Sequence, residues 1–283
     1  MHLPCRPADS NKSTFGSVLN IAGSVHFRGA AYLSTVSALR VGAGYATLAA
    51  IPPVIDAVAA KLSEAIFLPL PQDGATISRD AVFTLSSQIK SGTICSFGCG
   101  ISALQNASVN LSETTDELLN IFIQKRTPLV LDADGLNLLA KSPISFRFGN
   151  RCVMTPHPME LARLLHTDVE QIQKNRLDAA REASKKYEAI VLLKGHRTVI
   201  ALGEHGKINE TGNSALAKAG SGDCLTGVIA GLLAQKMEPF DAAVLGAHIH
   251  GLAGEMASKD FSEYGVLASD LPSYIARIIR DLK

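Results

Sequence analysis

Short apolar segments alternate with longer helical patterns along most of this chain, and that alternation restricts the possible folds more than any other feature. The short segments are apolar throughout, as expected of strands in a sheet that is covered on both faces. Between them, apolar residues recur at helical spacing at 29–43, 112–126 and 169–187. The segments interpreted as strands are SVLNIAG (17–23), YATLAAI (45–51), TICSFG (93–98), PLVLDAD (128–134), CVMT (152–155) and AIVLLK (189–194).

Strands that alternate with helices predict right-handed crossovers and an α/β fold, with a mostly parallel central sheet and helices on both faces. From Gly222 onward the chain is mostly helical in pattern, and helices are predicted near 223–235, 240–258 and 269–282. The 283 residues contain no repeat, no low-complexity linker and no break in composition. We therefore expect residues 1–283 to form one domain.

The charge balance argues against nucleic acid as the main partner, because 27 Lys+Arg against 26 Asp+Glu give no basic field for phosphate backbones. The five cysteines lack the spacing of a disulfide framework or a zinc site, and Cys95 and Cys99 are interpreted as small buried apolar residues. The N-terminus shows no signal peptide, and no apolar run approaches the roughly 20 residues that span a bilayer. We expect a cytoplasmic protein that does not enter a membrane.

Glycine-rich or polar segments follow the predicted strands, and ligands of open parallel sheets bind beyond the carboxyl ends of the strands. Any one of these segments is also what a turn in an α/β protein requires. Taken together, with acids, histidine and lysine at the same edge of the sheet, they predict a ligand site. The segments are GSVHFRGAA, GCGIS, DADGLN, TPHPMEL, LLKGHRT and AGSGDCLTG.

The last of these segments predicts an oxyanion or phosphate site. Gly220 and Gly222 let backbone N–H groups point into one concavity, and the following helix adds its positive N-terminal dipole. The segment has neither the P-loop spacing nor a G-x-G-x-x-G fingerprint. Asp223 has two interpretations here: a helix N-cap, a role that Ser221 could also fill, or a general base for a hydroxyl that attacks phosphorus. The helix N-terminus is expected to keep this acid ionised at neutral pH.

The stretch AKAGSGDCLTG resembles the anion-hole signature of the ribokinase-like superfamily. Together with LNIAGS, RGAAYLSTVSALRVGAGY, LDADGLNLL, TPHPMELARLL and LLKGHRTVI, it makes the chain resemble the ADP-dependent NAD(P)H-hydrate dehydratases from about residue 12 to 260. The family often carries His-Lys-Gly before the first strand, where this chain has NKSTFG. The resemblance implies a ribokinase-like three-layer αβα fold. It also implies repair of the S epimers of NADHX and NADPHX, with ADP as phosphoryl donor, Mg²⁺ as cofactor, and AMP and phosphate as products.

The resemblance also implies roles for individual residues. Asp223 would contact the substrate and take the hydroxyl proton as that oxygen attacks the β-phosphorus, while Gly222 would contact the nucleotide. The segment that follows one core strand would bind the AMP portion, although it also fits a surface turn at Gly195. Its residues are Lys194, Gly195, His196, Arg197 and Thr198.

Substrate contacts are implied for three further residues, Ala30, Gly100 and His157. His157 lies between Pro156 and Pro158, whose rings fix the local backbone, but a lone histidine is also commonly a structural residue. Asp134 and Asn137 are expected to contribute to substrate binding. The alternative is that Asp132 and Asp134 only shape the turn. Glu160 is the candidate residue for the acid that lies near the Mg²⁺ ion in ribokinase-like proteins.

Two rival functions remain open from the sequence. A vitamin or sugar kinase of the same superfamily would use the same aspartate but release a stable phosphate ester. A regulatory nucleotide-binding protein would keep the pocket, but would not need Asp223. The resemblance further implies a homotetramer. Relatives of this kind often accompany an epimerase for the hydrate, and this chain has no room for such a domain, so we expect that activity in a separate protein.

Overall fold

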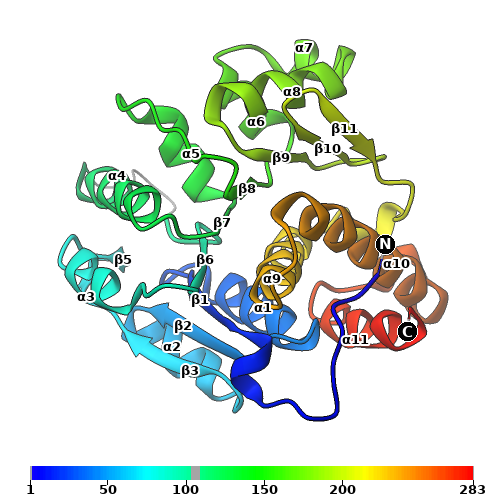
Figure 1. Cartoon of the computed structure of the whole chain (residues 1–283), viewed down its shortest axis with the longest axis horizontal. Coiled ribbons are helices and arrows are strands. Elements are labelled where there is room, and N and C mark those ends of the chain that lie inside the picture. Colours follow the sequence, from blue (N-terminus) through cyan, green and yellow to red (C-terminus); the bar gives the residue numbers. More distant parts are fainter. Residues whose placement is uncertain (1, 103–108, 283) are drawn as a thin grey trace.

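A nine-stranded sheet forms the centre of the computed structural model, which describes residues 2–102 and 109–282 (Figure 1). Its strand order is β11-β10-β9-β8-β7-β6-β1-β2-β3, and a separate two-stranded hairpin, β4-β5, lies outside it. The strands are β1 Ser17–Ile21, β2 Tyr45–Ala50, β3 Ile66–Pro69, β4 Gln72–Asp73, β5 Thr76–Ile77, β6 Ile94–Phe97, β7 Leu129–Leu131, β8 Cys152–Met154, β9 Ile190–Leu193, β10 Val199–Leu202 and β11 His205–Ile208.

Every strand pair from β3 to β9 is parallel, and only β10 and β11 pair antiparallel with their neighbours. The sheet is therefore mostly parallel, as predicted. The central strands are short and fully buried, and their residues alternate between two separate apolar clusters on the two faces. The carboxyl ends of these parallel strands consequently meet at one edge of the sheet.

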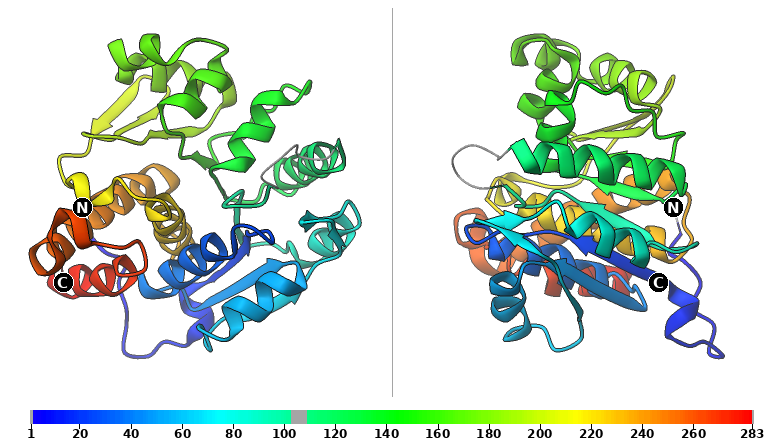
Figure 2. Two further views of the ribbon diagram at one scale, coloured as in Figure 1. Left: turned by 180° about the vertical axis from the view of Figure 1, so that it is seen from behind. Right: turned by 90° about the vertical axis from the view of Figure 1, so that its left-hand side faces the viewer.

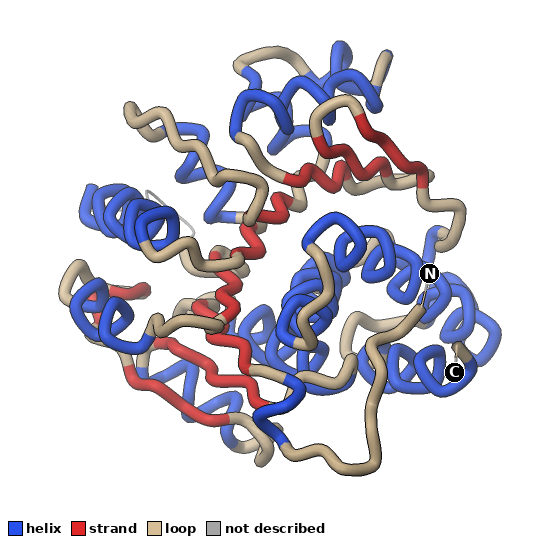
Figure 3. Tube along the Cα trace, viewed as in Figure 1, coloured by secondary structure: helices blue, strands red, loops and turns tan. Residues whose placement is uncertain are grey.

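Two helical layers cover the sheet, which Figure 3 shows as a band of strands with helices on both sides. One cluster joins the sheet to α2–α8, the other joins it to α9–α11, and α1 contributes to both, so the three-layer prediction is confirmed. The helices are α1 Arg28–Arg40, α2 Pro52–Ala59, α3 Ala81–Gln88, α4 Val109–Gln124, α5 Asp134–Lys141, α6 Pro158–Leu165, α7 Val169–Lys174, α8 Arg176–Tyr187, α9 Ser221–Ala234, α10 Pro239–Gly265 and α11 Leu271–Asp281, with short 3₁₀ helices η1 Lys12–Phe15 and η2 Ser214–Leu216.

The predicted helix at 169–187 is wrong in one respect, because it is two helices. Asn175 leaves the helical conformation with φ −144° and ψ 74°, and its side chain accepts a hydrogen bond from the backbone N–H of Asp178 at the start of α8. The chain turns there, and α7 and α8 take different directions. No helix among residues 2–102 and 109–282 is long and apolar enough to cross a membrane.

Two glycines on α9 bring that helix unusually close to α1, and Figure 2 shows the two helices side by side from behind the molecule. A Cβ atom at Gly227 would lie 2.1 Å from the carbonyl oxygen of Ser34, and one at Gly231 would lie 2.2 Å from Val41 Cγ1. Neither position can hold a larger residue without movement of the α1 backbone or core. The glycines are spaced four residues apart, so both face the same neighbour.

Candidate active site

Helix α9 begins at the carboxyl edge of the sheet, and its first turn carries Asp223. The N-cap is Gly220, whose backbone is left-handed (φ 91°), and the helix has no side-chain cap. Asp223 is the third residue of the helix, so its interpretation as an N-cap is wrong, and Ser221 is not the cap either. Since the acid does not satisfy the helix terminus, its side chain is free for another role.

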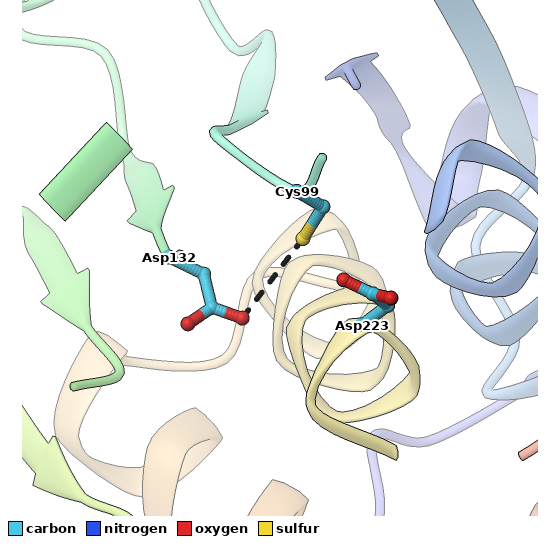
Figure 4. A group of neighbouring side chains, drawn as sticks. All are labelled: Cys99, Asp132 and Asp223. Carbon is cyan, nitrogen blue, oxygen red and sulfur yellow. Dashed lines mark hydrogen bonds between the residues drawn. The ribbon is translucent and has the colours of Figure 1, made fainter. Parts of the chain in front are cut away.

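Three side chains converge beside this turn, as Figure 4 shows. The thiol of Cys99 after β6 and the carboxylates of Asp132 after β7 and of Asp223 lie within 4.8 Å of one another. The Cys99 Sγ is 3.9 Å from Asp132 Oδ2 and donates toward it. Burial raises the pKa of the Cys99 thiol well above its ordinary value, so Cys99 is a neutral donor here, and it is also part of the buried apolar core, as expected.

Asp132 is the hub of this arrangement and is only 1% exposed. Its Oδ1 accepts a hydrogen bond from the Lys194 ammonium at 2.7 Å, and its Oδ2 accepts one from the Thr226 hydroxyl at 2.8 Å. Lys194 follows β9 and Thr226 lies one turn into α9. One buried carboxylate therefore ties the ends of two strands to the helix that carries Asp223.

Burial raises the pKa of Asp223 to about 6, and the neighbouring charge of Asp132 acts in the same direction. The hydrogen bond from Cys99 and the charge of Lys194 oppose this rise only in part. Asp223 is therefore still expected to be ionised at pH 7, which lies about one unit above its pKa. A carboxylate in this range is a stronger base than an exposed one, which suits a general base.

Lys194 and Glu160 form the second charged pair of the site. Glu160 is buried in the first turn of α6, and its Oε2 lies 3.9 Å from the Lys194 ammonium. Burial raises the pKa of Glu160 to about 7, although Lys194 partly offsets the rise. Burial by itself lowers the pKa of Lys194, but the carboxylates of Asp132 and Glu160 raise it above its ordinary value. The lysine therefore remains a cation inside the site.

His157 caps helix α6. Its Nδ1 accepts from the backbone N–H groups of Met159 and Glu160 at 3.1 and 3.3 Å, and the Glu160 carboxylate accepts from the backbone N–H of His157 at 2.8 Å. Since Nδ1 accepts, the proton of the neutral ring is on Nε2. The side chain is 47% exposed. The structure thus shows the structural use of His157, and the Nε2 of the same ring lies 3.4 Å from Glu160 Oε1.

Two glycines mark close approaches at the site. A Cβ atom at Gly222 would lie 3.4 Å from the Lys194 ammonium, so the predicted nucleotide residues Gly222 and Lys194 are neighbours. A Cβ atom at Gly100 would lie 2.9 Å from that of Ala30, which places two predicted substrate residues in contact across β6 and α1. Larger residues would fill both spaces.

Several other predicted site residues have partners within the protein. Asp134 Oδ2 accepts from the backbone N–H of Ser102 at 3.1 Å, and Asn137 Oδ1 accepts from Arg163 at 2.6 Å. The contact of Asp134 holds the segment after β6 to the start of α5, which agrees with a structural role, whereas the contact of Asn137 links α5 to α6. In the β9–β10 turn, Thr198 donates to the carbonyl of Gly195, Arg197 pairs with Glu210, and His196 is exposed.

Mg²⁺ favours oxygen ligands and commonly takes several from water and substrate phosphates. Among the residues that the structure describes, only Cys99, Asp132 and Asp223 form a group of three candidate ligands, and Glu160 is not part of it. The neutral thiol is a poor ligand, and both oxygens of Asp132 are already bonded. These residues fit a magnesium ion that phosphate oxygens and water would hold, which leaves the Asp223 carboxylate available as a base.

Sequence reasoning missed the roles of Asp132, Thr226 and His250. On α10, the His250 Nε2 lies 2.9 Å from the carbonyl oxygen and 3.1 Å from the hydroxyl of Ser221. Because a carbonyl can only accept, Nε2 carries the proton, and burial lowers the pKa of His250 to about 4. A neutral histidine therefore holds the first turn of α9. In the sequence, the signal for Asp132 was its place in the segment DAD (132–134) at the end of a predicted strand.

This fold is that of a ribokinase-like protein. A ribokinase-like superfamily protein from Enterococcus faecalis superimposes with a TM-score of 0.85 at 26% identity, over 99% of this chain and 92% of that one. Residues 18–277 match the family model of NAD(P)H-hydrate dehydratase. The chain therefore belongs to the NAD(P)H-hydrate dehydratase family.

Named relatives agree with this assignment. The bifunctional NAD(P)H-hydrate repair enzyme Nnr of Moorella thermoacetica is 38% identical over 99% of this chain, which spans only 52% of that protein's length. The ADP-dependent (S)-NAD(P)H-hydrate dehydratase of Neisseria meningitidis serogroup B is 34% identical, over 98% of this chain and 88% of that one. The ADP/ATP-dependent NAD(P)H-hydrate dehydratase of Bacillus subtilis, co-crystallised with ATP/Mg²⁺, matches with a TM-score of 0.83 at 31% identity, over 100% and 95% of the two chains.

Proposed function

We propose that this protein catalyses the ADP-dependent dehydration of the S epimers of hydrated NADH and NADPH, returning NAD(P)H with AMP and phosphate. The observation that carries the proposal is Asp223. Its carboxylate stands in the first turn of α9, uncommitted to helix capping, beside the buried cation of Lys194. Family membership and the activities named for the relatives support the choice of substrate and phosphoryl donor.

In the first step, the hydroxyl oxygen of the hydrate attacks the β-phosphorus of ADP, and the bond from that phosphorus to the AMP oxygen breaks. Asp223 takes the hydroxyl proton. The backbone N–H groups at the start of α9, the helix dipole and Lys194 stabilise the charge on the transferred group. When Mg²⁺ is bound to the phosphates, it supplies further charge neutralisation there.

In the second step, phosphate leaves the ring carbon because the lone pair of the ring nitrogen expels it. Loss of a proton from the adjacent ring carbon then restores the dihydropyridine. Phosphate is a far better leaving group than hydroxide at neutral pH, so the phosphoryl transfer is what makes the dehydration feasible. The atoms balance as hydrate and ADP converted to NAD(P)H, AMP, phosphate and a proton.

The other residues implied by the family resemblance enter the proposal with assigned parts. Ala30, Gly100 and His157 contact the hydrate. Asp134 and Asn137 are further contributors to its binding. Gly222 and the turn 194–198 contact the nucleotide, and the Lys194 ammonium acts from within the site. Glu160 acts through Lys194, with which it forms a charged pair, and its two oxygens face His157 and Lys194.

The test uses purified protein, hydrated NADH, ADP and Mg²⁺, and follows the recovery of dihydronicotinamide absorbance together with AMP and phosphate. Asp223→Asn should lower turnover by about 10² or more while ADP affinity changes little, as expected for loss of a general base. The exposed Asp56 on α2 gives the matched control, Asp56→Asn. A stable phosphorylated product would decide for a kinase, and normal turnover by Asp223→Asn would remove its role as base.

We further propose a cytoplasmic homotetramer that works with a separate hydrate epimerase. Free cysteines, of which the described ones are mostly buried, support a reducing compartment. Exposed apolar side chains support self-association, notably Phe83 (83% exposed) and Tyr264 (91%). Light scattering of the purified protein tests the assembly. Incubation with the R epimer of the hydrate tests the need for a separate epimerase, because this protein alone should leave it unconsumed.

A further inference from the structure

A second pocket lies at the opposite edge of the sheet from Asp223. It opens where β7 and β8 begin, between the end of α4 and the turn before β8, and encloses about 180 Å³. Leu129 and Cys152 are paired in register at the start of these strands, whereas Asp132 follows the other end of β7. We call it the arginine pocket, and its principal lining residues are Arg126, Arg147, Arg151, Phe122, Phe148 and Cys152.

The rim of the arginine pocket is strongly basic. Three arginines line it against a single acid, Glu188, so the formal charge of the lining is +2. Arg147 is paired with Glu188 at 2.8 Å. Among the residues that the structure describes, the side chains of Arg126 and Arg151 have no hydrogen-bond or ion-pair partner. Two guanidinium groups are therefore available to an anion.

The floor of the arginine pocket is apolar and rigid. Phe122, Phe148 and Cys152 are buried, with 1%, 6% and 1% of their surface exposed. The backbone N–H of Phe148 donates to the carbonyl of Tyr187 at 2.9 Å, which holds one wall to the end of α8. Above this packed floor, a ring can rest against the half-buried Ile123 and the planar guanidinium groups, which stack on rings and bind carboxylates and phosphates through paired donors.

We propose that the arginine pocket binds a small organic anion, in which one apolar ring carries a carboxylate or phosphate group. The volume favours one ring, since pockets for larger ligands typically enclose about 300 Å³ or more. Charge and floor both contribute, so a ring without charge and an inorganic anion without a ring bind less well. This site is separate from the proposed dehydration chemistry and does not depend on it.

Calorimetric titration with phenyl phosphate tests the proposal, with benzoate as the carboxylate probe and with benzyl alcohol and inorganic phosphate as the two half-ligands. Phenyl phosphate should bind at least about tenfold more tightly than either half-ligand. Arg126→Ala and Arg151→Ala should each weaken it by about tenfold, the value of one charge-assisted contact. Arg280→Ala removes the same charge from α11 and should change nothing. Saturating ADP should leave the affinity unaltered.

The proposal is overturned by the absence of phenyl phosphate binding, by binding that both pocket variants leave unchanged, or by displacement with ADP, which would place the probe at the carboxyl edge. Inorganic phosphate that binds as well as phenyl phosphate would reject the class of ligand, because the apolar floor would then contribute nothing. Thermal melts of each variant, recorded without ligand, separate a lost contact from a lost fold.

Discussion

Asp223 shows how the surroundings of one carboxylate set its chemistry. The helix N-terminus alone would favour its charged form, but burial and the charge of Asp132 raise its pKa to about 6. The group is mostly ionised at pH 7 and mostly protonated at pH 5. Its function as a base therefore belongs to a definite pH range.

This pKa predicts the acid limb of the pH–rate profile. A base must be unprotonated, so log kcat/KM should fall as the pH falls through about 6, approaching a slope of about one. Asp132→Asn removes a negative charge that raises the pKa of Asp223. It also leaves the positive charge of Lys194 less neutralised, so that this charge lowers the pKa of Asp223 further. Both changes move the limb to lower pH. Asp56→Asn should keep the wild-type profile, and an unmoved limb in Asp132→Asn would contradict the stated origin of the shift.

The Asp132–Lys194 pair supports a second prediction, which concerns stability. Lys194→Met leaves a buried carboxylate with Thr226 as its main partner, and the free energy of unfolding should fall by about 3 kcal/mol or more. Replacing both members, as Asp132→Leu with Lys194→Met, removes the unpaired charge and should recover most of that loss. Urea unfolding of the two single variants and the double variant measures this, and simple additivity would contradict the coupling.

These residue-level contacts also mark what one sequence could not predict. Asp132 was passed over as a turn residue because its partners Lys194 and Thr226 lie 62 and 94 residues away. His157 was predicted as a substrate contact, and its capping of α6 could not be read from the sequence because it depends on the direction of its Nδ1. Residue type and local spacing are readable in a sequence, whereas the partners of a buried polar group depend on the packed fold.

Among the elements, the buried parallel strands were the most predictable because each is apolar along its whole length. The edge strands were not: β11 is exposed at all four residues, and β3 is exposed or half-buried, so neither carries a buried-strand pattern. The break at Asn175 interrupts a pattern that reads as one amphipathic helix. Elements whose neighbours lie on one side only, or that change direction at one residue, leave a weak sequence signal.

The contact between α10 and α9 supports a prediction at this scale. His250→Leu removes the donor to the Ser221 carbonyl, so the first turn of α9 loses an anchor and turnover should fall by about tenfold through misplaced donors. His250→Gln offers an amide donor and should recover much of the rate. His248→Leu, two residues away on α10, is the matched control. A lower melting temperature with normal kcat in His250→Leu would show that the contact is purely structural.

At the scale of the molecule, the two opposite edges of the sheet offer two separate sites. ADP at about 100 times its Kd should raise the free energy of unfolding by about 2.7 kcal/mol, which corresponds to several degrees in Tm. Phenyl phosphate should add its own increment, because distant sites without shared partners are close to additive. Thermal melts with each ligand and with both measure this. The absence of an ADP effect would contradict a nucleotide site.

The close packing of α9 on α1 through Gly227 and Gly231 has a consequence for motion. A helix that touches its neighbour's backbone cannot slide or roll without a clash, so α9 is the fixed reference of the molecule. The base on its first turn is therefore held in a fixed position relative to α1, and elements that are less tightly packed are the ones that can move toward it.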